Sequence, residues 1–328
     1  MGPRDGLGPS PASGTGRIPY APRTDGESGF RCFRPDGRPP SCLSSTSLYL
    51  FGVTPGEEIR LRLVLHYDGS RFHGWQIQPE LRTVQGVLHA VARHLTGAER
   101  TITGSGRTDR GVHATGQVAS LMVPSSWSAD TFRRAMNANL PGDVWVADAQ
   151  EVERDFHPRY DAIARTYRYR LGLSREAWSP FVRPWCWPLE KTPDLSVLDA
   201  AAARIPGDRS FDAFAKSGQP QRGTRCRVDR AHWEPWEDHG VQLTITANRF
   251  LHHMVRYLVG TMVAVGWGRR PPEELEALLE GGPTDELWTS APAPASGLFL
   301  HRVEYPEGTT RSRHRALRER TSRSELFP

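Results

Sequence analysis

Lysine is almost absent from this chain of 328 residues, because Lys191 and Lys216 are the only two among 42 basic side chains. The positive charge is therefore carried by arginine, whose planar and permanently charged fork of donors suits phosphate groups. A formal net charge of +5 makes nucleic acid a candidate partner without establishing it. A GC-rich genome would also favour arginine over lysine, so this bias alone is weak support.

Cysteine and long apolar runs are scarce as well. No CxxC pair and no zinc-type spacing occurs among the four cysteines, Cys32, Cys42, Cys186 and Cys226. A zinc set made of Cys226, His232 and His239 is a poor candidate. No apolar run approaches the length of a membrane span. With no signal peptide in view, we expect a protein of the reducing cytoplasm, without a metal or a membrane segment.

Composition divides the chain into four segments. Residues 1–55 are rich in glycine, proline and serine and show no apolar period, so we expect a disordered extension. Residues 56–155 and 156–306 each have the pattern of a strand–helix half, and no sequence repeat relates them. Residues 307–328 form a basic tail that we expect to be flexible, either touching RNA or solvated.

Alternation of apolar and polar residues predicts strands over residues 59–67, 118–123, 143–149, 163–171 and 241–247. Helices are expected after the capping residues Thr83 and Asp130, from Asp194 towards Ile205, and over residues 250–268. Residues 216–230 have the composition of an arginine-rich connector. Because strands outnumber helices and do not alternate strictly with them, we expect an α+β fold with a mainly antiparallel sheet.

Residues 104–119, GSGRTDRGVHATGQVA, match neither a strand nor a helix. Glycines on both sides of Asp109 permit unusual backbone angles or the close approach of another molecule. Arg107 and Arg110 would favour the charged form of the Asp109 carboxylate, which makes Asp109 a candidate nucleophile or base. An Asx turn with solvated arginines is the ordinary alternative for such a loop.

Three further features carry candidate side chains, each with an ordinary alternative. Arg71, Phe72 and Trp75 interleave as on a base-stacking surface, although a loop pinned by Trp75 has the same composition. Tyr167 lies on the apolar side of its predicted strand, where a core tyrosine is common. Arg256 stands inside an apolar helix and either extends to water or pairs with a buried acid.

Taken in order, these segments closely resemble the TruA family of tRNA pseudouridine synthases over about residues 58–306. The matching stretches are YDGSRFHGWQIQPELRTVQGVL, GSGRTDRGVHATGQVA, FHPRYDAIARTYRYRL, FDAFAK, TRCRV, FLHHMVRYLVGTMVAVG and APAPASGLFLHRVEYP. The motif GRTDxGVHA is highly specific. The nearest departure is Tyr257, where many members have asparagine after the helix arginine, and the arginine itself is kept.

The resemblance implies the pseudouridine synthase fold, with two similar halves, flanking helices and a basic active-site cleft between the halves. It implies isomerisation of uridine to pseudouridine at positions 38, 39 or 40 of the tRNA anticodon arm, without metal or cofactor. Asp109 would be the catalytic aspartate, attacking the sugar or the base or removing a proton from the ribose. Tyr167 would stack on the target base, Arg256 would pair with Asp109, and Leu298 would pack against the base.

RNA contacts are expected from residues around this centre and from the arginine-rich connector: Arg71, Phe72, Trp75, Arg107, Arg110, His113, Arg165, Lys216, Arg222 and Arg225. A site that accepts several positions should read shape and backbone more than base edges. The base must be flipped out of its stem, and Arg107 would fill the vacated stack or hold a phosphate. Family members act as homodimers with one tRNA lying across both subunits, and we expect the same here.

Two other functions are compatible with parts of the sequence. One is an RNA-binding module of the same fold that lacks activity, although intact Asp109, Tyr167 and Arg256 argue against it. The other is a metal-dependent hydrolase built around Asp109, His252 and His253. Adjacent histidines on a helix point to opposite sides, so we expect that these two do not share a metal.

Overall fold

The computed structural model describes residues 56–216 and 223–308. The extension predicted over residues 1–55 lies outside the described residues. So do Arg222 and residues 309–328 of the predicted tail.

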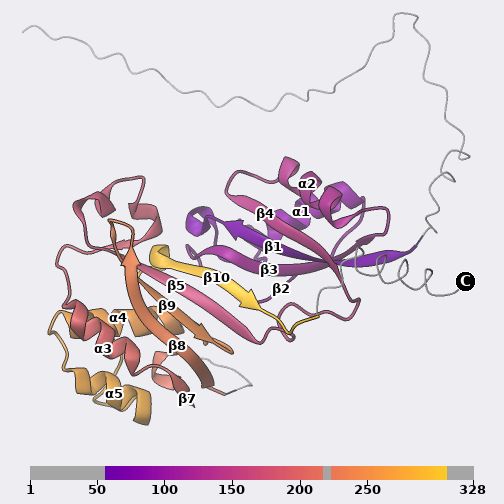
Figure 1. The fold of residues 1–328 in the computed structure, drawn as a ribbon. Coiled ribbons are helices and arrows are strands. Elements are labelled where there is room, and N and C mark those ends of the chain that lie inside the picture. The colour runs from indigo at the N-terminus through magenta and orange to yellow at the C-terminus, as the bar shows by residue number, and fades with distance from the viewer. Residues whose placement is uncertain (1–55, 217–222, 309–328) are drawn as a thin grey trace, which may run out of the picture. The chain divides into compact units, whose positions relative to one another are not determined.

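One mixed, mostly antiparallel sheet runs through the described chain in the order β4-β1-β3-β10-β5-β9-β8-β7, with β2 paired to β3 and β6 paired to β5 (Figure 1). Among these strands, the pairs β10–β3 and β5–β6 are parallel. The α+β fold and the mainly antiparallel sheet expected from the sequence are confirmed. The strands are β1 (Glu58–Tyr67), β2 (Thr103–Gly104), β3 (His113–Pro124), β4 (Val144–Val152), β5 (Ala164–Gly172), β6 (Trp187–Pro188), β7 (Gly207–Ser210), β8 (Arg225–Trp236), β9 (Gly240–Ala247) and β10 (Leu298–Glu304).

Of the two predicted helix caps, one is confirmed and one is wrong. Thr83 accepts a hydrogen bond from a first-turn amide, as expected, and Asp194, from which the third helix was expected to run, also accepts hydrogen bonds from first-turn amides. The second helix is capped by Ser128 instead of Asp130, which lies inside its first turn. The fourth helix begins at Met254, because the backbone turns sharply just before it. The α-helices of the described residues are α1 (Val84–Thr96), α2 (Ala129–Asn139), α3 (Leu195–Ala203), α4 (Met254–Gly266) and α5 (Pro272–Gly281).

Strand β8 corrects the expectation of a connector over residues 216–230. Its first residues alternate, with Arg225 and Arg227 exposed and Cys226 and Val228 buried. The exposed positions of this part of the strand are charged, most of them arginine, and the charge conceals the strand period. The strand predicted over residues 163–171 starts one residue later than expected. Ile163 precedes β5 and is 51% exposed, so it does not belong to the buried face of the strand.

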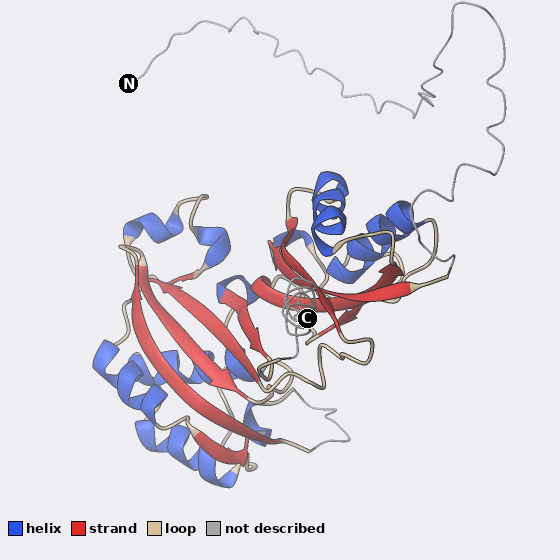
Figure 2. Cartoon of the chain, turned by 45° about the vertical axis from the view of Figure 1, so that its right-hand side comes forward, coloured by secondary structure: helices blue, strands red, loops and turns tan. Residues whose placement is uncertain are grey.

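Strand β10 joins two hydrophobic cores. Leu300 packs with the core of β1, α1 and α2, and Leu298 packs with the core of β5, β9, α3, α4 and α5. These two residues are two apart on one strand, so both cores lie on the same face of the sheet. Helices α3, α4 and α5 lie together against the strands of the second core (Figure 2). Tyr167 packs against both cores, so it stands where the halves meet.

Candidate active site

The loop between β2 and β3 carries Asp109 and is held by the segment that follows β1. The amide of Trp75 donates to the carbonyl oxygen of Thr108 at 3.0 Å. The amide of Gly111 donates to the carbonyl oxygen of Phe72 at 3.3 Å. These backbone bonds fix both sides of Asp109 without using its side chain.

Two glycines permit the close approach of these segments. A Cβ at Gly69 would overlap the carbonyl group of Val112, and a Cβ at Gly74 would lie 2.7 Å from the carbonyl oxygen of Thr108. Gly74 also has a φ of 91°, in the region that favours glycine. Any larger residue at either position would push against the backbone of the Asp109 loop.

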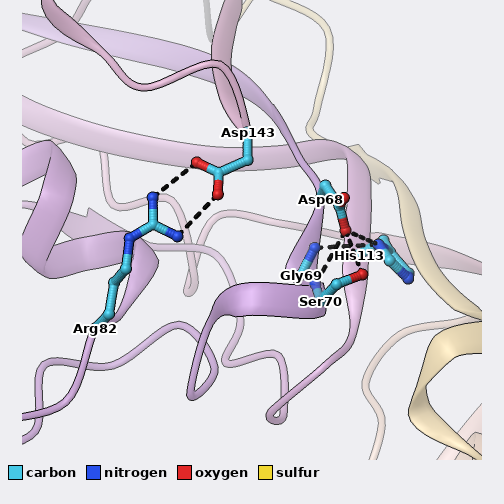
Figure 3. A network of polar contacts seen from close by, with 6 residues as sticks. All are labelled: Asp68, Gly69, Ser70, Arg82, His113 and Asp143. Carbon is cyan, nitrogen blue, oxygen red and sulfur yellow. Dashed lines mark hydrogen bonds and ion pairs between the residues drawn. The ribbon is translucent and has the colours of Figure 1, made fainter. Parts of the chain in front are cut away.

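The aromatic residues of this segment face inward. Phe72 is 1% exposed and Trp75 is 3% exposed, so neither offers a ring to RNA in this conformation. The Arg82 guanidinium lies 4.0 Å from the centre of the Phe72 ring and donates to both oxygens of Asp143 at 2.8 Å (Figure 3). The burial of Phe72 and Trp75 argues against the predicted stacking contacts with RNA and indicates that these two rings support the Asp109 loop from beneath.

His113 is likewise buried, at 1% exposure, and its ring stacks on Phe299 with centroids 4.7 Å apart. Its Nδ1 lies 3.1 Å from both the Asp68 carboxylate and the amide nitrogen of Gly69, so one of these two bonds forms at a time (Figure 3). A hydrogen bond from His113, followed by bonds from Ser70, lowers the pKa of Asp68. His113 therefore ties the end of β1 to β3, and its burial argues against the predicted RNA contact.

Two residues that the sequence reasoning did not single out hold the loop from beneath. The hydroxyl of Tyr67 lies 2.8 Å from Oγ1 of Thr108. Gln117 donates through Nε2 to the carbonyl oxygen of Gly106 at 2.9 Å and accepts from Ser105 Oγ at 2.7 Å. The inward period of β1 predicts a buried Tyr67, but no sequence pattern indicates its hydroxyl partner.

The Asp109 carboxylate, 22% exposed, faces three basic side chains of the segment at the start of α4. His252 Nε2 lies 3.2 Å from Oδ1, and His253 Nε2 lies 3.3 Å from Oδ2. Arg256 Nη1 lies 3.7 Å from the same Oδ2. Arg256 is the partner expected for Asp109, whereas the two histidines were considered with Asp109 only as a possible metal set.

The expectation that His252 and His253 diverge is wrong, because they precede α4 in a turn. His253 is the N-cap residue and has the left-handed angles φ 65° and ψ 3°. Their ring centroids lie 4.2 Å apart, and both Nε2 atoms point to Asp109. The HH pair within FLHHMVR is the signal from which this contact could have been predicted.

The three donor atoms of Asp109, His252 and His253 lie within 4.8 Å of one another, a spacing that suits a divalent transition metal ion. Arg256 contacts the same carboxylate, and its permanent charge opposes a second cation there. The case against a metal therefore depends on charge and not on the direction of the histidines.

Arg256 is held by backbone as well as by Asp109. Its Nε donates to the carbonyl oxygen of Ala293 at 2.7 Å, and the Ala293 amide donates to the carbonyl oxygen of Arg256 at 2.9 Å. The side chain is 15% exposed. It therefore turns toward Asp109 and does not extend to water.

Tyr167 lies on β5 with its ring edge-on to Phe250, at a centroid distance of 4.8 Å. Burial raises the pKa of its hydroxyl, and the negative charge of Asp109 acts in the same direction. Tyr167 is therefore a neutral phenol next to the Asp109 loop. Leu298 is 5% exposed at the start of β10 and belongs to the adjoining core.

The basic residues expected to contact RNA fall into two groups. Arg71, Arg107 and Arg110 are exposed around the Asp109 loop. Lys216 is exposed beside the histidine pair, and its amide donates to the carbonyl oxygen of His252 at 3.1 Å. These four side chains are available to phosphate groups near Asp109.

Arg165 and Arg225 are committed to the protein itself. Arg165 donates to the backbone carbonyl oxygens of four residues, at 3.0, 2.9, 3.3 and 2.6 Å, from Ala162, Asn248, Ser105 and Arg159. Arg225 pairs through Nε with Asp208 at 2.8 Å but is exposed. Arg165 therefore fastens several segments together, whereas Arg225 can exchange its partner for a phosphate.

Comparison with known proteins defines the class to which this site belongs. The sequence profile of the family described as tRNA pseudouridine synthase matches residues 63–161 and 201–306. Three relatives, each called tRNA pseudouridine synthase A, are similar to the chain over most of both lengths. The relative from Maridesulfovibrio salexigens is 38% identical over 76% of this chain and 91% of its own.

The relative from Roseiflexus sp. (strain RS-1) is 40% identical over 76% of this chain and 92% of its own. That from Moorella thermoacetica is 39% identical over 75% and 99%. The chain belongs to the tRNA pseudouridine synthase A (TruA) family, and the family expected from the sequence is confirmed. It is an isomerase with a pseudouridine synthase domain. Within residues 56–216 and 223–308, no helix has the length and apolar character that a membrane crossing requires.

Proposed function

We propose that the chain converts uridine to pseudouridine at positions 38, 39 and 40 in the anticodon arm of tRNAs. The bond between the ribose C1′ and uracil N1 breaks, the base turns, and C1′ joins C5. The proton on C5 leaves and N1 gains one, so substrate and product are isomers. No electron is transferred, and we propose that no cofactor takes part.

Asp109 is proposed as the catalytic residue, and its surroundings carry the assignment. The carboxylate stands in a glycine-bordered loop that lets a flipped nucleotide approach closely, and it faces the side chains of His252, His253 and Arg256. Such fixed donors hold a carboxylate in one orientation before the substrate arrives. The same geometry serves attack on the sugar or the base and removal of a ribose proton.

Tyr167 and Arg256 are proposed to complete the centre. The neutral phenol of Tyr167 next to the Asp109 loop offers a face for the target base and a group that can exchange a proton with its C5. Arg256 orients Asp109 through the contact with Oδ2. Leu298 is proposed to close the site from the adjoining core.

The tRNA is proposed to bind through shape and phosphate contacts. Arg71, Arg107, Arg110 and Lys216 supply exposed positive charge around Asp109, and Arg225 adds more along β8. Charged contacts of this kind bind many sequences, as an enzyme acting on several tRNA positions requires. A homodimer in the cytoplasm, with one tRNA across both subunits, completes the proposal.

Pseudouridine formation on an unmodified tRNA transcript, mapped by position, tests this function. Wild type should give signal at the anticodon arm, Asp109→Asn should give none, and the two proteins should bind tRNA within several-fold of each other. Asp130→Asn, a change on the surface of α2, is the matched control and should keep full activity. A folded, tRNA-binding wild type that forms no pseudouridine would favour an inactive RNA-binding module of the same fold.

A further inference from the structure

His253 has a backbone conformation that its side chain does not favour. Its φ of 65° lies in the left-handed region, where glycine and asparagine are the usual residues. Strain of this kind persists where the surrounding structure imposes it, which is common at functional sites. Glycine or asparagine would adopt this turn with less strain. The presence of histidine at position 253 therefore calls for a role of its imidazole side chain.

The His253 imidazole bridges the two charged groups of the site. Its Nε2 lies 3.3 Å from Asp109 Oδ2 and 3.3 Å from Arg256 Nη1, whereas Arg256 and Asp109 are 3.7 Å apart. Burial lowers the pKa of His253, and Arg256, His252 and Lys216 act in the same direction against the opposing effect of Asp109. A neutral imidazole at this point either donates to the carboxylate or accepts from the guanidinium.

The two oxygens of Asp109 have different surroundings. Oδ2 faces His253 and Arg256, whose side chains are 17% and 15% exposed. Oδ1 faces His252, whose side chain is 45% exposed and stands on the solvent side. A nucleotide that enters from solvent therefore reaches Oδ1 by displacing one exposed side chain, whereas Oδ2 is held from within the protein.

We propose that His253 is a positioning residue that anchors Oδ2 of Asp109 against Arg256, leaving Oδ1 as the oxygen that meets the substrate, with His252 as its displaceable cover. This inference rests on the proposed role of Asp109 in the reaction. His253 touches no reacting atom and acts through the carboxylate. Its strained turn places Nε2 where both partners can be reached.

Two substitutions distinguish the role of the His253 side chain from that of the left-handed backbone turn. His253→Asn suits the left-handed backbone but is too short to reach Asp109, so it should keep or raise thermal stability. Its turnover number on tRNA should nevertheless fall about 10- to 100-fold, as losses of orienting partners do. His253→Gln places an amide nitrogen near the position of Nε2 and should recover most of that loss. KM for tRNA should stay within a few-fold of wild type in both variants.

His89→Gln is the matched control, because His89 lies on α1 and pairs with Glu99 at 3.0 Å, and its turnover should stay close to wild type. Wild-type turnover in His253→Asn, or a loss in both His253 variants that follows their stability, would overturn the proposal. A readout independent of turnover separates this inference from the proposed function. Crystal structures should show one orientation of the Asp109 side chain in wild type and more than one in His253→Asn. One orientation in both proteins would also overturn the proposal.

Discussion

Gly69→Ala tests whether the segment after β1 sets the position of Asp109. The added Cβ would lie 2.5 Å from the carbonyl carbon of Val112, where ordinary contact begins at 3.4 Å. The added Cβ meets backbone atoms, which cannot rotate away as a side chain could. The two backbone segments must therefore separate by about 1 Å in an otherwise close-packed interior. The Val112 amide donates to the carbonyl oxygen of Asp109 at 3.1 Å, so a shift of Val112 carries Asp109 with it.

The expected magnitudes differ for folding and for catalysis. Overpacking of this kind costs about 1–3 kcal/mol of unfolding free energy. In a protein of this size, that loss lowers the melting temperature by about 2–10 °C. A displacement of 1 Å at the catalytic group lowers turnover about 100-fold, since the substrate no longer meets the carboxylate in line. Binding of tRNA should change little, because the long exposed side chains of Arg107 and Arg110 can still reach a phosphate after a shift of about 1 Å.

The assay combines thermal unfolding, tRNA binding and single-turnover pseudouridine formation. Gly142→Ala is the control, since Gly142 is exposed, has no left-handed φ, and a Cβ there meets nothing within 4 Å. It should match wild type in all three measurements. Full turnover by a folded Gly69→Ala protein would refute the argument that this close approach positions Asp109.

Three further outcomes are expected. Arg256→Lys keeps the charge but not the bond to Ala293, so turnover should fall about 10- to 100-fold with tRNA affinity unchanged, and wild-type turnover would contradict the anchored geometry. Asp68→Asn should remove about 1 kcal/mol of unfolding free energy near neutral pH. This value is smaller than that of a fully buried hydrogen bond to a charged group, because water partly screens the exposed Asp68 carboxylate. The pKa of Asp68 is lowered by folding, so this stability is present above the unfolded pKa and is lost as pH falls through the folded pKa. Denaturant midpoints of the two proteins should therefore converge in acid, and a constant gap would contradict the pairing with His113. A chelator should leave turnover unchanged, because Arg256 opposes a cation at Asp109, and activity that returns with one divalent metal would contradict this.

Secondary structure was predictable wherever one face of an element is apolar and the other polar. The strand from Glu58 to Tyr67 alternates strictly, and Thr83 marks the start of α1, so both follow from local chemistry. The first part of β8 is not predicted, because charged side chains, most of them arginines, occupy its exposed positions and give it the composition of a connector. The start of α4 was misplaced because a left-handed residue that is not glycine leaves no mark in the sequence.

Some residues of the candidate site could be predicted from local sequence, whereas others depend on how distant segments pack together. The Asp109 loop and Arg256 were indicated by motif and resemblance, since both are local features of the sequence. The contacts of His252 and His253 with Asp109 join segments more than 140 residues apart, and they depend on a turn that periodicity cannot reveal. The burial of Phe72, Trp75 and His113 depends on two loops packing together, and composition alone could not separate a stacking surface from a support.

Asp109 belongs to the half built on β1 and β3, and the side chains that face it belong to the half built on β5, β9 and α4. The halves meet at β10, which pairs with β3 through Phe299 opposite His113 and Leu300 opposite Ala114. The proposed active site therefore needs both parts and is formed where they meet. Loosening of this short seam would switch the enzyme off while both cores stay folded. We therefore expect heat to abolish turnover at a lower temperature than it unfolds either core.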